Sequence, residues 1–172
     1  MIRSFRGKSP RIAESAFVSE AAYLIGDIEI GENSSVWPGA VIRADVGGME
    51  VGGSIKIGRN THIEDNCVVH FTKEIGDNVV LGHGAVVEAT KIGSNIVIGD
   101  NATVLGYAEI GDFCLIGAGS VVTQGMEIPS YSFVLGVPAE IKGKLTEKQV
   151  ELIGFTLRTV NRLVEAHKNE RE

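Results

Sequence analysis

Aliphatic residues recur at every sixth position along most of this chain. Leu, Ile or Val fills the first position of twenty hexads, and the register returns after each interruption. The fifth position of many hexads is small or short, and Gly follows the aliphatic residue in eight of them. The first positions are Ile12, Val18, Leu24, Ile30, Val36, Ile42, Ile57, Ile63, Val69, Ile75, Leu81, Val87, Ile92, Ile98, Val104, Ile110, Ile116, Val122, Ile128 and Val134.

A period of six fits neither an amphipathic helix, with a period of 3.6, nor a half-buried strand, with a period of two. It is typical of a β-solenoid that turns a corner every six residues and forms its core by stacking successive coils. Three hexads complete a triangular coil, so residues eighteen apart share a face. The sequence therefore predicts an all-β parallel β-helix of nearly seven coils. We expect glycine at the corners, where it tolerates backbone conformations that are costly for other residues.

The pattern breaks in a glycine-rich stretch and stops after Val134. Residues 47–56 (GGMEVGGSIK) do not fit the hexads and predict a loop. Thr146 opens a capping-box sequence with Gln149, and apolar residues then follow at spacings of three and four. We therefore expect a β-helix domain over 1–145 and an α-helix over 146–172 that packs on the solenoid, with its polar end (AHKNERE) frayed.

Composition narrows the classes of partner. The net charge of -6 without a basic face argues against a nucleic-acid partner. The chain has no apolar stretch as long as a membrane span and no signal-peptide pattern at its N-terminus, so a cytoplasmic protein without membrane partners is expected. Cys67 and Cys114 fall at inward fifth positions, which favours small core residues over a disulfide or a nucleophile.

Stacking also places polar residues in columns. His70 and Glu88 are eighteen apart at the second position of their hexads, and Arg43 precedes them in the same column if the loop is set aside. Adjacent strands lie about 4.8 Å apart, so His70 and Glu88 could reach one metal ion. Asp65 and His83 form a second column on another face. Because the two histidines project from different corners, a site that uses both would require a second subunit.

A single histidine at a solenoid corner is more often a solvated surface residue than a metal ligand. His62 has no candidate ligand in its column, and His167 lies near the end of the predicted helix. Both are interpreted as surface residues.

Several segments resemble the γ-class carbonic anhydrase family, and the resemblance covers essentially the whole chain. They are VIRADV (41–46), IGRNTHIEDNCVVH (57–70), IGDNVVLGHGAVVEAT (75–90), IGAGSVV (116–122) and VLGVPAEI (134–141). The resemblance implies a left-handed β-helix and a homotrimer with a zinc, iron or cobalt ion at each subunit interface. It also implies reversible hydration of carbon dioxide to bicarbonate by metal-bound hydroxide.

The metal ligands follow from this resemblance residue by residue. His70 matches the first ligand, and His83 matches the ligand given to the neighbouring site. Glu88 stands where the family has a third histidine. Two histidines and a glutamate form a known catalytic zinc set, but the carboxylate lowers the charge of the metal centre and makes a bound water less acidic. We therefore expect weak or absent hydration activity unless Glu64 or Glu88 compensates as a base.

Other site residues are implied in the same way. Arg43 and Asp45 match a pair that forms an intersubunit salt bridge, and Arg43 helps to hold bicarbonate. Asp65 matches an acidic residue near the metal, and Glu64 replaces a glutamine there and is a candidate proton carrier.

Three alternative functions remain open at this point. They are metal-dependent hydrolysis of a thioester or another small carbonyl compound, acyl transfer as in hexapeptide acyltransferases, and a non-catalytic role as an assembly subunit. The pairing of His70 with Glu88 in one column argues against acyl transfer, which needs no metal.

Overall fold

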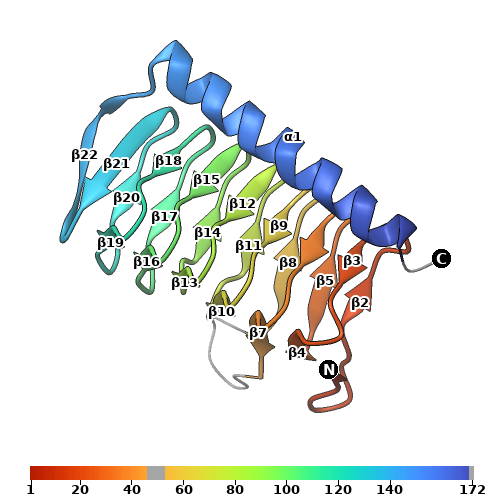
Figure 1. Cartoon of the computed structure of the whole chain (residues 1–172). Coiled ribbons are helices and arrows are strands. Elements are labelled where there is room, and N and C mark those ends of the chain that lie inside the picture. The colour runs from red at the N-terminus through yellow and green to blue at the C-terminus, as the bar shows by residue number, and fades with distance from the viewer. Residues whose placement is uncertain (46–52, 171–172) are drawn as a thin grey trace.

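The computed structural model describes residues 1–45 and 53–170 and shows a three-sided, left-handed β-helix of about seven coils with one C-terminal helix alongside (Figure 1). The predicted fold class is confirmed. Most of the predicted loop lies outside the described residues. Ile55 and Lys56, which were assigned to the loop, already belong to a strand.

Each face of the solenoid is a sheet of short strands, in which every strand pairs in parallel with its neighbours one coil away, except at the C-terminal end. The first sheet contains β1 (Ile2–Arg3), β4 (Tyr23–Gly26), β7 (Val41–Ala44), β10 (Val68–His70), β13 (Val86–Val87), β16 (Thr103–Val104) and β19 (Val121–Val122). The second contains β2 (Arg11–Ile12), β5 (Ile28–Ile30), β8 (Ile55–Ile57), β11 (Glu74–Ile75), β14 (Lys91–Ile92), β17 (Glu109–Ile110) and β20 (Glu127–Ile128). The third contains β3 (Phe17–Val18), β6 (Ser35–Val36), β9 (His62–Ile63), β12 (Val79–Leu81), β15 (Ile96–Ile98), β18 (Leu115–Ile116), β21 (Ser132–Gly136) and the antiparallel β22 (Ala139–Lys144).

The hexad pattern accounts for the core. Of the twenty aliphatic first positions, all but Ile12 and Val18 are buried, and those two pack against the core from the N-terminal coil. Cys67 and Cys114 are also buried. Burial raises the pKa of Cys67 to about 12, so its thiol is inert at neutral pH.

Some corners use glycine as expected, since Gly84 and Gly119 adopt positive φ of 70° and 66°, but others do not. At the corners after Ile57 and Ile75 the left-handed backbone conformation belongs to Asn60 and Asn78, with φ of 50° and 56°. Gly58 instead permits close stacking, because a Cβ there would lie 2.6 Å from the carbonyl oxygen of Gly76 in the next coil. The glycine beside each aliphatic residue therefore serves coil-to-coil contact.

Helix α1 (Glu147–Asn169) runs along the third sheet and contacts β12 and β15. Thr146 caps it with the predicted capping box to Gln149. Val160 and Val164 pack with Phe17 and Trp37 of the solenoid. Residues 166–169 at the polar end are helical, contrary to the expectation that this end frays, and residues 171–172 lie outside the described part of the chain. Among the described residues, no helix is long and apolar enough to cross a bilayer.

The prediction that His62 is a surface residue is wrong, because α1 covers it. Its side chain is fully buried, and Nδ1 lies 2.8 Å from the Ser35 hydroxyl oxygen, which also accepts a hydrogen bond from Trp37 Nε1. The Nε2 atom faces Asn161 of α1 without a well-formed hydrogen bond. Burial lowers the pKa of His62 to about 4. His167 is exposed, as expected, although its ring packs on Trp37 with ring centroids 5.1 Å apart.

Candidate functional site

Two clusters of polar side chains lie at different corners of the triangle. The first cluster comprises Arg43, Asp45, His70 and Glu88 and lies where the chain leaves the first sheet. The second comprises Glu64, Asp65, His83 and Asp100 and lies where the chain leaves the third sheet. Among the described residues no hydrogen bond or ion pair joins the two clusters. Each therefore presents its own set of candidate ligands.

Strand register builds the first cluster. His70 pairs directly with Arg43 across β10 and β7, and the pairing of Val69 with Val87 brings Glu88 alongside His70. Arg43 donates from Nη2 to Asp45 at 3.0 Å, and His70 Nε2 lies 3.9 Å from Asp45 Oδ1. Burial lowers the pKa of His70, and Arg43 adds to this effect, while Asp45 and Glu88 oppose it. At neutral pH the imidazole is neutral and can act as a ligand.

The second cluster surrounds His83. Its Nδ1 lies 3.1 Å from Asp65 Oδ2, its Nε2 lies 3.4 Å from Glu64 Oε2, and its backbone N–H donates to Asp100 Oδ1 at 3.0 Å. Ligand atoms of Glu64, His83 and Asp100 all lie within 4.8 Å of one another. Burial raises the pKa of Glu64, and the carboxylates of Asp100 and Asp65 raise it further, while His83 opposes this.

Sequence reasoning missed Asp100. It occupies the third hexad position, as Asp65 and His83 do, but it follows His83 by seventeen residues instead of eighteen. One residue is missing from the corner between Val87 and Ile92, and Ile75 accordingly pairs with Ile92. A search of the same hexad position, corrected for that missing residue, would have found it.

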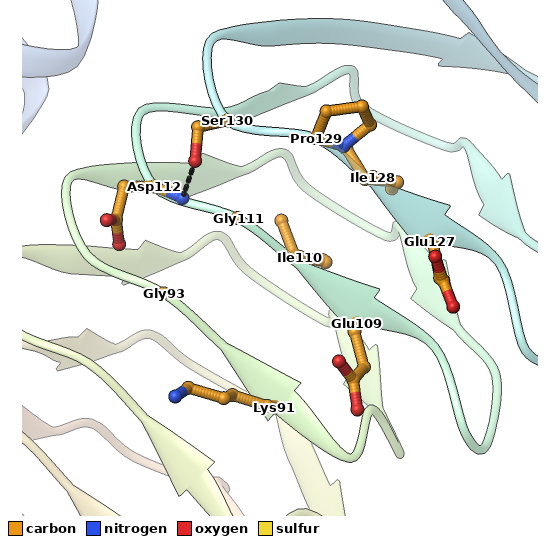
Figure 2. Close-up of a pocket in the computed structure, with 10 residues that line it drawn as sticks. All are labelled: Lys91, Gly93, Glu109, Ile110, Gly111, Asp112, Glu127, Ile128, Pro129 and Ser130. Atoms are coloured by element: carbon orange, nitrogen blue, oxygen red, sulfur yellow. Dashed lines mark hydrogen bonds between the residues drawn. The ribbon is translucent and has the colours of Figure 1, made fainter.

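A recess lies on the second sheet, and its lining includes no residue of either cluster. Figure 2 shows Lys91, Glu109 and Glu127 following one another across β14, β17 and β20. These side chains end an exposed ladder of alternating charge, Arg11, Glu29, Lys56, Glu74, Lys91, Glu109 and Glu127, in which only the last two neighbours are alike. The recess is a charged, solvated surface without a histidine in its lining.

The like-charged end of this ladder gives a stability prediction. Glu109 and Glu127 lie directly opposite one another in register, and like charges in that position are destabilising. We expect Glu127→Lys to raise the free energy of unfolding by about 0.5 kcal/mol in urea titrations at low salt. Glu20→Lys, at an exposed site outside the ladder, is the control, and an equal gain there would contradict the ladder explanation.

Comparisons with known proteins agree with this architecture. The family model described as "Bacterial transferase hexapeptide (six repeats)" matches residues 89–124. A hexapeptide transferase family protein from Anaplasma phagocytophilum superimposes with a TM-score of 0.87 at 31% identity, covering 96% of each chain. A putative acetyltransferase from Bacillus cereus superimposes with a TM-score of 0.89 at 30% identity, covering 98% of this chain and 96% of that one.

The relatives found by sequence indicate a narrower family than the family model and the solved structures do. A protein named probable carbonic anhydrase from Methanocaldococcus jannaschii is 44% identical over 146 residues, which cover 83% of this chain and 88% of that protein. Gamma carbonic anhydrase 2, mitochondrial, from Arabidopsis thaliana is 34% identical over 173 residues and 95% of this chain. This chain spans only 60% of the length of that plant protein.

Repeats, coil geometry and structural matches together define a hexapeptide-repeat β-helix protein. Within that class, the chain belongs to the γ-carbonic anhydrase-like family.

Proposed function

We propose that the chain forms a homotrimer that binds a divalent metal at each subunit interface and hydrates carbon dioxide reversibly to bicarbonate. The proposed ligands are His70 and Glu88 of one protomer and the partner subunit's His83. His70 carries the proposal, because its Nε2 atom is buried and has no hydrogen-bond partner among the described residues.

The donor set fits a metal. A buried polar atom without a partner is costly, so the Nε2 atom of His70 calls for a ligand that the described residues of one chain do not supply. Glu88 adds a carboxylate beside it, and two nitrogens with one carboxylate are a common catalytic zinc set. We propose zinc, although the same donors accept iron or cobalt. When bound, such a metal lowers the pKa of a coordinated water and so supplies the nucleophile.

The outer surface of the first sheet supports a trimer. Its outward residues stack as a ladder of mostly apolar, partly buried side chains, Tyr23, Val41, Val68, Val86, Thr103 and Val121. The outer surface of the second sheet carries the charged ladder, and α1 covers the outer surface of the third sheet. Parallel sheets are usually buried on both faces, and an uncovered apolar stripe favours an interface. The two clusters flank this stripe, so packing the first sheet against a partner would bring unlike clusters together.

The remaining cluster residues have roles that their contacts suggest. Asp65 lies at His83 Nδ1, where it would orient the ring and leave Nε2 for a metal, as carboxylates do behind metal-bound histidines. Arg43, held by Asp45, can hold bicarbonate through its guanidinium. Glu64 lies 3.4 Å from His83 Nε2 and can accept the proton that carbon dioxide hydration releases.

The test combines metal content with catalysis. The protein, purified without a metal-binding tag and loaded with zinc, cobalt or anaerobic iron, should bind close to one ion per chain and accelerate carbon dioxide hydration in stopped-flow assays. Glu88→His should raise hydration at neutral pH about tenfold, because one unit of pKa changes the ionised fraction of a nucleophilic water by that factor. Glu109→His, on the charged ladder, is the matched control.

Two outcomes would contradict the proposal. Absence of bound metal under every loading condition would exclude the metal site. Metal binding without hydration, in both the native protein and Glu88→His, would exclude the reaction.

Acyl transfer is a second candidate, supported by the His83–Asp65 pair. An exposed histidine whose Nδ1 contacts a carboxylate can act as a general base, and the matched structures include proteins named as acetyltransferases. Transfer from acetyl coenzyme A by metal-free protein would favour this candidate over hydration.

A further inference from the structure

A recess between α1 and the solenoid joins an apolar wall to the second cluster. Trp37 and Pro38 line it from the solenoid, and Leu163 lines it from the helix. The rest of the lining is mostly polar and includes Glu64 and His83. The docking of α1 therefore creates a cavity that the coils alone would not form.

The apolar wall is rigid and already in place. The indole of Trp37 donates from Nε1 to Ser35 at 2.8 Å and packs on Phe17 with ring centroids 5.2 Å apart. Val160 and Val164 of α1 hold the other side of these rings. The nearby Leu163 is 48% exposed, so an apolar ligand in the recess would cover a side chain that the fold leaves in water.

Carbon dioxide has no part that would use such a wall. A substrate that carries a short alkyl chain would, since its chain can lie on Trp37 and Leu163 while its polar end reaches Glu64 and His83. Small-molecule sites typically combine a mainly apolar lining with a few converging polar groups.

We propose that the recess binds the alkyl chain of a short-chain ester and that the adjoining site hydrolyses the ester. The inference rests on the proposed function, because the second cluster is one half of the proposed metal site. A water oxygen bonds to the acyl carbon, and the bond from that carbon to the alkoxy oxygen breaks. Glu64 accepts the proton that the water loses and returns it to the departing alkoxide, giving a carboxylic acid and an alcohol.

Binding can be measured without metal and without turnover. Trp37 is the single tryptophan of the chain, so its fluorescence reports on the recess. Metal-free protein is titrated with hexanamide and with acetamide, two uncharged analogues of the ester. We expect hexanamide to bind at least about tenfold more tightly, because each methylene buried on the apolar wall adds to affinity. Equal dissociation constants would overturn the proposal.

Two exposed leucines of α1 provide a matched pair of variants. Leu163 lines the recess, whereas Leu152 is also 48% exposed and lies outside it. Leu163→Ala should weaken hexanamide binding severalfold, and Leu152→Ala should leave it unchanged. An equal effect of both substitutions would assign the binding to the helix surface in general and overturn the recess.

Hydrolysis is tested on the metal-loaded protein. The value of kcat/KM should be higher for ethyl hexanoate than for ethyl acetate, and no hydrolysis of either ester would overturn the catalytic part of the proposal. The two proposals fail separately. Selective hexanamide binding without carbon dioxide hydration would exclude the hydratase function and leave the proposed alkyl-binding recess standing. Carbon dioxide hydration with equal binding of the two amides would exclude the alkyl-binding recess and leave the hydratase function standing.

Discussion

Mixed trimers of His70→Ala and His83→Ala should regain metal that neither variant binds alone. In the proposed trimer each site takes His70 from one protomer and the partner subunit's His83, so either substitution removes a ligand from every site of a homotrimer. We expect the metal content of each variant to fall at least about tenfold. A trimer containing both variants has one interface at which both histidines are intact. Refolding an equal mixture should therefore restore about one quarter of the native metal content.

This experiment also tests the rival arrangement within one chain. Glu64, His83 and Asp100 have ligand atoms within 4.8 Å of one another in a single protomer. If that cluster bound the metal alone, His70→Ala would keep its metal, and mixing would add nothing beyond the average of the two variants. His167→Ala, at an exposed histidine outside both clusters, should match the native protein throughout.

The sequence predicted most of the coil because stacking repeats the same physical constraint at each hexad. Burial of the aliphatic positions and the pairing of His70 with Arg43 follow from that repeat. The ligand roles of His70, His83 and Glu88 remain predictions. Asp100 escaped notice because a missing residue shifts its column, a local change that a fixed period cannot represent.

Where α1 docks could not be derived from the hexads alone, and this caused the error at His62. The helix covers the outward side chains of the third sheet, and a signal for this was present at the sixth hexad position. In that sheet the position is mostly apolar, as at Phe17, Val80 and Leu115, whereas the second sheet has charged residues there. The first sheet is also mostly apolar at this position, so the signal excluded the second sheet without choosing between the other two. An outward column that is apolar needs a cover, and the amphipathic C-terminal segment was the available one.

Burial of His62 should make the protein lose stability in mild acid. Its pKa is about 4 in the folded state against an ordinary value of 6.5, so the folded protein binds fewer protons than the unfolded chain between these values. The stabilisation is complete above pH 6.5, declines as the pH falls, and is lost below about pH 4. A difference of this size corresponds to about 3 kcal/mol in the free energy of unfolding.

The surroundings of His62 explain why its pKa is lowered and why stability falls in acid. Protonation would bury the charge of an imidazolium under α1, with the cationic Lys168 nearby and only the neutral Asn161 as a hydrogen-bond partner. Urea titrations between pH 7 and pH 4 measure the loss. His62→Gln cannot titrate, so its stability should depend on pH less steeply than that of the native protein by about 3 kcal/mol over this range. His167→Gln should retain the native slope, and a native slope in His62→Gln as well would assign the acid sensitivity to other groups.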